Sequence, residues 1–320
     1  MIKKEYICSF TISMRPLISI CIPSYENVAL VKRLLDSIVS QTFKDYEVII
    51  TDDSRSNAVE ILSHTYKSSI PGLTYFKNAE PLGSPANWNK AIRQANGQWI
   101  KLMHHDDFFT RPDALALFAQ KTQEPLSGDF IFSNYISFSA YAETPHRVTS
   151  LETILLRKSP LNLFKRNFIG PPSTTLIRNN NTSWYDERVK WVVDFEFYIN
   201  YLSTTTFTYI AESLIGIGVH EAQITASVFR KKGTEIPENF YLLEKLGARI
   251  LSNIFVYDYY WRSFRNLKIR SIADLAPYTT IETIPKKMLR LMKFQFAIPL
   301  SVLKIGPISK CLMAFSYCFR

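Results

Sequence analysis

Two adjacent carboxylates, Asp106 and Asp107, follow directly after a short apolar run at residues 99–103. An apolar run of this length, entered through Gly97 and ended by charge, is typical of a buried strand in a parallel sheet. Two carboxylates at a strand end repel each other and lose solvation, so the site needs a compensating charge. A divalent cation, Mg²⁺ or Mn²⁺, would provide it and would also hold a phosphorylated substrate. A solvated turn before a helix is the other interpretation of this pair taken alone.

Two further apolar runs, residues 17–22 and 48–51, also end in polar loops. Pro23 ends the first run, and Asp52 and Asp53 follow the second. Ligands of open α/β sheets bind outside the carboxyl ends of the strands, so the polar loops after all three runs should meet at one edge. The sequence has no glycine-rich dinucleotide fingerprint and no P-loop, so phosphate recognition must depend on a metal.

Strands and helices are expected to alternate along the first third of the chain. Asn27 is placed to cap a helix with apolar residues at helical spacing, and Ser84 with Pro85 opens another helix that Gly97 closes. This pattern predicts an α/β fold with a mostly parallel, Rossmann-like sheet flanked by helices. Further along we expect helices at 112–123, 149–164 (with a capping box of Thr149 and Glu152) and 191–201, and strands at 130–132, 173–178 and 215–220.

Asp194 lies on a predicted helix among aromatic residues. Partial burial there would raise its pKa toward that of a useful general base, although an ordinary acid at a helix N-terminus explains the residue equally simply. Glu196 is predicted to lie on a solvated helix face. His104 and His105 are interpreted as structural, and whether either touches the metal stays open.

The net charge of +10 is unevenly distributed, because residues 283–320 hold seven Lys or Arg and no acid. Basic and apolar residues alternate from 286 to 296, which suits an interfacial helix on anionic lipid, and a plain packing helix is the other interpretation. No nucleic-acid-binding motif accompanies the basic tail. No apolar run is long enough to span a bilayer, and the cysteines form no metal-type pair, so we expect a cytoplasmic protein, peripheral on the inner face of the membrane.

Taken as an ordered series, these residues resemble glycosyltransferase family 2 with the GT-A fold. The similarity covers roughly residues 16–230 and rests on motifs at 22–27 (IPSYEN), 51–54 (TDDS), 81–84 (PLGS), 104–107 (HHDD), 172–175 (PSTT), 184–187 (WYDE), 193–195 (VDF) and 220–225. The series departs from the family pattern at two positions. His104 replaces the usual first aspartate of the metal motif, and Val193 replaces the glutamate before the base.

The resemblance implies an inverting glycosyltransferase with Asp194 as the catalytic base and a divalent cation, Mg²⁺ or Mn²⁺, held by Asp107 and His220. The donor implied is a nucleotide-diphosphate sugar, most simply a UDP-sugar, and the acceptor is a glycan or lipid-linked glycan of bacterial surface polysaccharide. A non-catalytic sugar-nucleotide-binding scaffold protein remains the alternative. Donor-binding residues implied by the family motifs are Pro23, Tyr25, Glu26, Asp52, Asp53, Gly83, Asn87 and Asp106.

The domain organisation expected from the resemblance and composition has two parts. Residues 1–230 form the GT-A domain, with a nucleotide-binding half at about 16–110 and an acceptor half at about 111–230. Residues 231–320 form a basic, helical C-terminal extension of two or three helices, and the boundary is expected near 231–233.

Overall fold

The computed structural model describes residues 15–182, 184–219 and 229–319. Strands and helices alternate through the first third of the chain, as predicted. The elements there are β1 (Ile18–Ser24), α1 (Val28–Val39), β2 (Tyr46–Asp52), α2 (Ala58–Tyr66), β3 (Leu73–Lys77), α3 (Ala86–Arg93) and β4 (Trp99–Leu102).

The middle of the chain, residues 108–218, supplies the remaining strands of the sheet and further helices. Its elements are β5 (Phe108–Phe109), α4 (Ala114–Thr122), β6 (Phe130–Phe138), β7 (Glu143–His146), α5 (Ser150–Lys158), the 3₁₀ helices η1 (Pro160–Lys165) and η2 (Pro172–Thr174), β8 (Thr175–Arg178), α6 (Val193–Leu202) and β9 (Phe207–Gly218).

The C-terminal part is helical, as predicted, but it contains more helices than the two or three expected. Its elements are α8 (Lys232–Leu246), η3 (Ala248–Ser252), α9 (Ile254–Asn266), η4 (Ala273–Leu275), η5 (Ile281–Thr283), α10 (Lys286–Phe296), α11 (Leu300–Leu303) and α12 (Gly306–Cys318).

The sheet confirms the predicted α/β architecture. Across the described residues its strand order is β3-β2-β1-β4-β8-β6-β9-β5, with β7 paired to β6. The first four of these strands are parallel neighbours, whereas β8 runs antiparallel to both β4 and β6. The carboxyl ends of β1, β2, β3 and β4 therefore share one edge.

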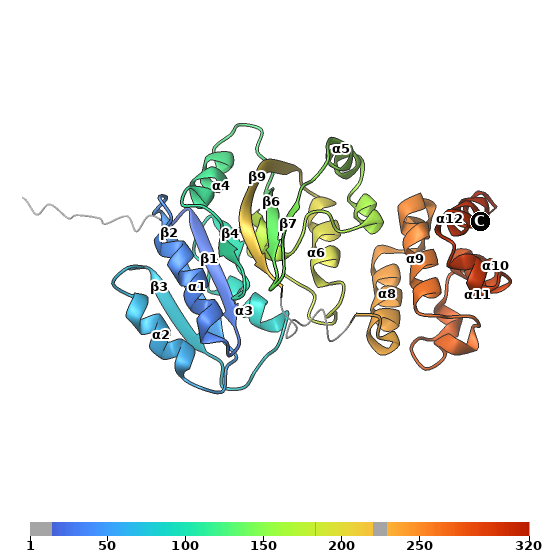
Figure 1. Ribbon diagram of the computed structural model, residues 1–320, viewed down its shortest axis with the longest axis horizontal. Helices are drawn as coiled ribbons and strands as arrows, with labels where there is room; N and C mark the ends of the chain where they lie inside the picture. Colours follow the sequence, from blue (N-terminus) through green and yellow to red (C-terminus); the bar gives the residue numbers. More distant parts are fainter. Residues whose placement is uncertain (1–14, 183, 220–228, 320) are drawn as a thin grey trace, which may run out of the picture.

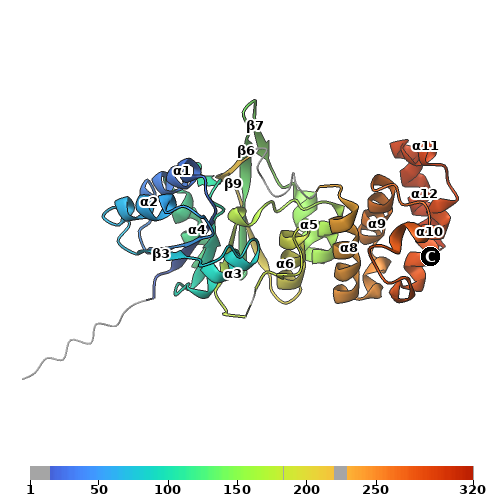
Figure 2. The ribbon, with the colours of Figure 1, turned by 90° about the horizontal axis from the view of Figure 1, so that it is seen from below.

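Both faces of the sheet are buried. Ile18, Ile20 and Ile22 of β1 belong to a core cluster that includes α1 and α4, whereas Cys21 belongs to a second cluster that includes α3 and α6. Figure 2 shows α1 and α3 on opposite sides of the strands. Because successive side chains of a strand point to opposite faces, a strand covered on both sides reads as a continuous apolar run, which is the pattern the sequence shows.

The strand at 17–22 runs two residues further than predicted. Pro23 and Ser24 still belong to β1 and pair in register with Thr51 and Asp52 of β2. Asn27 caps α1 as expected, because its side chain accepts a hydrogen bond from Leu30 N at 3.4 Å.

The helix expected between Ser84 and Gly97 is shorter than predicted. Pro85 occupies the N-cap position of α3 without a side-chain cap bond, so Ser84 is not the capping residue, and the helix ends at Arg93. Gly97 is needed instead at the entry to β4, since a Cβ there would lie 2.6 Å from Ser19 N.

Three other predicted boundaries need correction. The capping box of Thr149 and Glu152 is present, but α5 ends at Lys158 because Pro160 forces the preceding residue into an extended conformation and starts η1. The strand expected from residue 173 begins at Thr175, after η2. The helix expected at 191–201 is α6, which begins two residues later.

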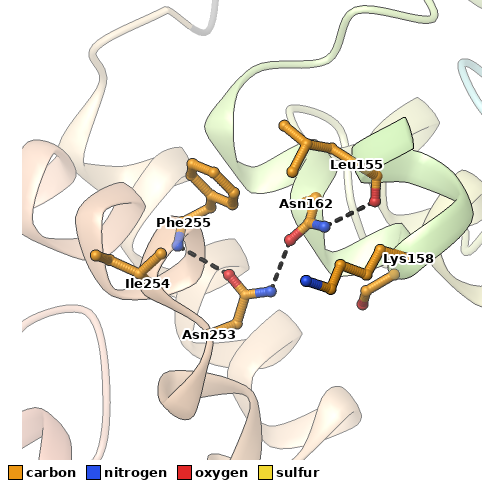
Figure 3. A pocket seen from close by; sticks show the side chains of 7 residues that line it. Leu155, Lys158, Asn162, Asn253, Ile254 and Phe255 are labelled. Atoms are coloured by element: carbon orange, nitrogen blue, oxygen red, sulfur yellow. Dashed lines mark hydrogen bonds between the residues drawn. The ribbon is translucent and has the colours of Figure 1, made fainter. Parts of the chain in front are cut away.

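The C-terminal helices α8 to α12 extend from the side of α6, at the end of the molecule opposite α2 and β3 (Figure 1). Figure 3 shows one junction, in which Asn253 caps α9 and donates to Asn162 Oδ1 of η1 at 2.8 Å, while Asn162 Nδ2 donates to Leu155 O at 2.7 Å. The same residues line a pocket of about 310 Å³. Arg262 of α9 donates further hydrogen bonds to Phe164 O and Lys165 O of η1.

The division into domains at residue 230 stays a prediction.

Residues 286–296 form helix α10, which fits the second interpretation of this segment, a packing helix. Met288, Leu291 and Met292 are inaccessible to solvent, and the other apolar side chains of α10 are partly buried, so α10 packs against the protein. Exposed apolar side chains lie instead on and beside α12: Ile305, Ile308, Phe315 and Phe319. Within the part of the chain that the structure describes, no helix has both the length and the apolar character of a membrane span.

Candidate functional site

The loops after β1 and β2 lie together, as the sheet topology requires. Ser24 Oγ donates to Asp52 Oδ1 at 3.0 Å, Asp53 N donates to Ser24 O at 3.0 Å, and Glu26 N donates to the Ser54 hydroxyl at 2.6 Å. We call residues 23–27 and 52–54 the β1–β2 edge. These bonds fix the two loops as one surface.

Asp52, a predicted donor-binding residue, is fully buried. Its carboxylate accepts hydrogen bonds from Ser24 Oγ, from Ser54 N at 2.9 Å and from Tyr75 OH at 2.7 Å, and Lys77 Nζ lies 3.6 Å away. A carboxylate with this many donors from its own chain is held by the fold. In the structure Asp52 therefore joins three strand ends.

Asp53 is also buried, and it holds the loop that follows β3. It accepts from Asn78 Nδ2 at 2.6 Å, from Leu82 N at 3.0 Å and from Gly83 N at 2.8 Å. Gly83 has a φ of +70°, a conformation that favours glycine. The side chain of Asn87 accepts a hydrogen bond from Asn78 Nδ2 at 3.0 Å and donates one to Thr51 O at 3.1 Å. Asp53, Gly83 and Asn87 thus belong to one network that shapes the β1–β2 edge.

Tyr25 differs from its neighbours because its side chain is 52 % exposed. Glu26 has a φ of +52°, and its Oε1 accepts from Arg55 N at 2.8 Å. Pro23 is buried within β1. The aromatic ring of Tyr25 is therefore available at this edge to a planar group.

A second group of polar side chains lies in the turn after β4. His104, Asp106 and Asp107 offer ligand atoms that all lie within 4.8 Å of one another. The turn is fixed by His104 N, which donates to Ser173 Oγ at 3.0 Å, and by Gly218 N of β9, which donates to Asp107 Oδ1 at 3.2 Å. The sequence alone does not decide whether His104 contacts a metal. In the fold its imidazole lies beside the carboxylates of Asp106 and Asp107.

Burial dominates the electrostatics of this turn. Burial, followed by the charge of Asp106, raises the pKa of Asp107 well above its ordinary value, against opposing bonds from Ser173 and Gly218. Burial also lowers the pKa of His104 to about 4, so its imidazole is neutral at pH 7. His104 Nε2 is buried without a hydrogen-bond partner among the described residues. A neutral imidazole and two carboxylates form a donor set that fits Mn²⁺ or Mg²⁺.

Asp194 lies in the first turn of α6, partly buried. Burial raises its pKa to about 7. No side chain of the described residues donates a hydrogen bond to its carboxylate. Burial first, and then the charge of Asp194, raise the pKa values of Tyr185 and Tyr198.

An aromatic wall joins Asp194 to the acidic turn. Tyr185 stacks on Phe197 of α6 with ring centroids 4.1 Å apart, and its edge meets Trp88 of α3 at 5.3 Å. Trp88 in turn lies 4.6 Å from the His104 ring. Asp194 and the His104–Asp107 turn therefore lie along one wall formed by α6, the 184–187 stretch and α3.

The prediction for Glu196 is wrong, because its side chain is buried and not on a solvated face. Lys245 of α8 bonds both Glu196 Oε1 at 2.6 Å and Asp186 Oδ2 at 2.7 Å. Hydrogen bonds from Arg188, and then from Lys245, hold the pKa of Asp186 well below its usual range. Both acids near Asp194 are thus neutralised by cations, whereas Asp194 has no such partner among the described residues.

Lys101 was not singled out from the sequence. This fully buried lysine of β4 donates to Ser173 O and to Thr175 O, the latter at 3.1 Å, and its Nζ lies 4.4 Å from the centroid of the Phe118 ring. It therefore fastens β4 to the segment that carries Ser173. The signal in the sequence is a single charged residue inside the apolar run at 99–103.

His220, predicted to contact the metal, lies outside the described residues. The last residue of β9 before it, Gly218, reaches the acidic turn through its bond to Asp107. A side chain at Gly218 would collide with the Asp106 carbonyl oxygen.

Comparisons with known proteins agree with this arrangement. Residues 19–182 match the family described as glycosyl transferase family 2. A relative from Escherichia coli K12, a putative colanic acid biosynthesis glycosyl transferase, is 27% identical over 218 residues, which cover 66% of this chain and 76% of the relative.

Two solved structures share the fold. Staphylococcus aureus TarS 1–349 in complex with UDP-GlcNAc has a TM-score of 0.59 at 17% identity and covers 94% of this chain and 89% of its own. A mannosyltransferase from Pyrobaculum calidifontis, in complex with GDP-Man and Mn²⁺, has a TM-score of 0.54 at 13% identity and covers 96% and 87%.

Proposed function

This chain belongs to glycosyltransferase family 2 and is an enzyme that transfers a sugar from a nucleotide sugar, and we propose that it does so with inversion, in a metal-dependent reaction. The acceptor is a hydroxyl group of a glycan or lipid-linked glycan. The reaction is a single displacement at the anomeric carbon, in which the acceptor oxygen attacks as the nucleoside diphosphate leaves. The acceptor hydroxyl must lose its proton, so a general base has to lie beside it.

Asp194 is that base in our proposal, and its environment is the observation that carries it. A base works best when its pKa lies near the working pH, and burial brings the pKa of Asp194 to about 7. Asp186 and Glu196, the other acids nearby, are engaged by Lys245. Trp88, which is only partly buried, provides an aromatic surface against which a sugar ring can pack, and the buried ring of Tyr185 supports it from behind.

The metal ligands in our proposal are Asp107, Asp106 and His104. The fit rests on the closeness of their ligand atoms and on the buried, unpartnered Nε2 of His104. His220, which follows β9, is proposed to complete the set. A divalent cation bound here would neutralise charge on the diphosphate. The Mn²⁺ complex of the Pyrobaculum neighbour supports this choice of cation.

The β1–β2 edge is proposed to bind the nucleotide. Exposed Tyr25 packs against the base, while Pro23 and Glu26 shape the loop that carries it. Asp52, Asp53, Gly83 and Asn87 keep the edge in place through their mutual bonds. The UDP-GlcNAc complex of the TarS neighbour supports a uridine nucleotide.

The biological role that we propose is surface polysaccharide synthesis at the inner face of the cell membrane. The colanic acid relative supports the role. The region from 283 to 320 contains no acid, and the exposed side chains Ile308, Phe315 and Phe319 could enter the lipid interface while the basic residues meet anionic headgroups.

Vesicle binding tests this membrane proposal. The variant Phe315→Ser with Phe319→Ser should bind phosphatidylglycerol vesicles at least about tenfold more weakly, since each buried aromatic contributes about 1.5–3 kcal/mol. Leu126→Ser is the matched control, because Leu126 is 95% exposed on a different part of the surface. Equal binding of the wild type to neutral vesicles, or an unchanged double variant, would contradict the proposal.

A panel of nucleotide sugars tests the enzymatic proposal. A UDP-sugar with Mn²⁺ or Mg²⁺ should give the largest protection against thermal unfolding and should be hydrolysed slowly, with both effects lost in chelator. Protection by guanosine nucleotides alone would overturn the choice of donor, and equal protection in chelator would overturn the metal site. Binding without hydrolysis, and without transfer to membrane extract, would favour the non-catalytic scaffold.

A further inference from the structure

We infer that Glu238, on α8 of the C-terminal extension, is a positioning residue for Asp194; this inference rests on the proposed function. Glu238 is 7% exposed, and its carboxylate faces the backbone just before α6. Oε1 accepts from Lys190 N at 2.8 Å, and Oε2 accepts from Trp191 N at 2.7 Å and Val192 N at 3.2 Å. One carboxylate thus binds three consecutive N–H groups.

One of these bonds satisfies a need that the local sequence cannot meet, while the bonds to Lys190 and Trp191 fix the chain just before the helix. The first four N–H groups of a helix, beginning with that of the N-cap residue, lack partners within the helix. The N-cap residue of α6 is Val192, which has no side-chain acceptor. Glu238 places a negative charge at this helix start, where the helix dipole favours an anion and where charge-assisted bonds are strong.

The position of Asp194 follows from the same contacts. Asp194 lies two residues after Val192, and no side chain of the described residues holds its carboxylate. The direction of that carboxylate therefore depends on the backbone of the first turn. Because Glu238 fixes the backbone immediately before that turn, it determines where the proposed base points.

Other contacts from α8 hold the same stretch of chain. Lys245 Nζ bonds Asp186 and Glu196, and Tyr241 OH donates to Asp186. Figure 1 shows α8 beside α6. The C-terminal extension thus contributes to catalysis through a clamp on the segment 186–196, in addition to any contact with a membrane.

Glu238→Gln tests the inference in the full-length protein, because glutamine keeps the shape but loses the charge. We expect kcat for UDP-sugar hydrolysis with Mn²⁺, and for transfer to membrane extract, to fall about tenfold to a hundredfold, as small misplacements of a catalytic group do. The dissociation constant of UDP should stay within about twofold, because no hydrogen bond or ion pair of the described residues joins α8 to the β1–β2 edge or to the His104–Asp107 turn.

Glu235→Gln is the matched control. Glu235 lies on the same helix, is 8% exposed and accepts a hydrogen bond from a backbone N–H, that of Arg230, but among the described residues it makes no hydrogen bond or ion pair to the segment 186–196. Glu235→Gln should retain the wild-type kcat. An equal loss of kcat in both variants would overturn the inference, because it would indicate general damage to α8.

A double variant distinguishes positioning from a structural role. If Glu238 acts through Asp194, then Glu238→Gln should lower kcat no further in a protein that already carries Asp194→Asn. Additive losses, or a wild-type kcat in Glu238→Gln, would overturn the inference. A wild-type kcat in Asp194→Asn would instead show that the proposed base itself is wrong, so the two failures can be told apart.

Discussion

Two groups of acids differ in their partners: Asp52 and Asp53 lie at the β1–β2 edge, and Asp107 and Asp194 lie along the aromatic wall. At the β1–β2 edge, Asp52 and Asp53 accept hydrogen bonds from several donors of their own chain. Along the aromatic wall, Asp107 has fewer donors and a strongly raised pKa, and Asp194 has no side-chain donor among the described residues. Burial therefore does not distinguish the two groups of acids, whereas the supply of hydrogen-bond donors from the protein does.

The largest effect should come from Asp107. Asp107→Asn removes a carboxylate from the proposed cation site, so both donor binding and sugar transfer should fall, transfer by about a hundredfold to a thousandfold. UDP affinity, measured by calorimetry with Mn²⁺ and with chelator, should become nearly independent of metal. Asp113→Asn, at an exposed ion pair with Arg111, is the control and should behave as the wild type. Metal-dependent UDP binding retained in Asp107→Asn would contradict the site.

Substitution of Asp53 should mainly lower the stability of the protein, whereas substitution of Asp107 should mainly lower donor binding and sugar transfer. Asp53→Asn removes the charge that holds Leu82 N and Gly83 N, and it should lower the free energy of unfolding by about 1–3 kcal/mol. Urea denaturation measures this loss, and UDP should bind more weakly because the loop at 78–83 is released. An unchanged urea midpoint would remove the distinction between the two groups of acids.

A third effect concerns the dependence of stability on pH, to which Asp194 contributes through its raised pKa. The folded pKa of Asp194, about 7, exceeds its ordinary value of 3.8, so between these values the folded protein binds more protons than the unfolded one. The contribution of this group to stability is therefore lost as pH rises toward 7. Asp194→Asn should make the protein more stable than the wild type at pH 8, with a smaller difference at pH 5. Urea midpoints at both pH values measure it, and a destabilised variant at pH 8 would contradict the raised pKa.

Much of the fold could be predicted from local patterns. Apolar runs that end in polar loops located β1, β2 and β4, and Asn27 with its spaced apolar residues located α1. The errors arose where tertiary contacts override local signals. Residues 23–24 remain in β1 because β2 continues to pair with them. Helix α10 looked interfacial because its periodicity does not reveal that α9 and α12 pack against it.

The kinds of residue in the site could be predicted from the sequence, but their hydrogen-bond and ion-pair partners could not. Acids at strand ends indicated a ligand-binding edge of the sheet. Nothing in the local sequence indicated that Tyr75 would donate a hydrogen bond to Asp52 or that Lys245 would form an ion pair with Glu196. The contact of Glu238 with Trp191 joins residues 47 positions apart. Such pairings depend on the packing of the C-terminal helices, which periodicity cannot reveal.

The central claim is that Asp194 acts on the acceptor proton and not on the donor. Asp194→Asn preserves size but cannot take a proton, and removal of a general base commonly lowers the rate by about 10²–10⁴-fold. The decisive measurement compares the rate of sugar transfer with the dissociation constant of UDP and Mn²⁺ in this variant and in the wild type. We predict a loss of transfer in that range with UDP affinity within about twofold. Transfer at the wild-type rate, or an equal loss of UDP affinity, would contradict the account.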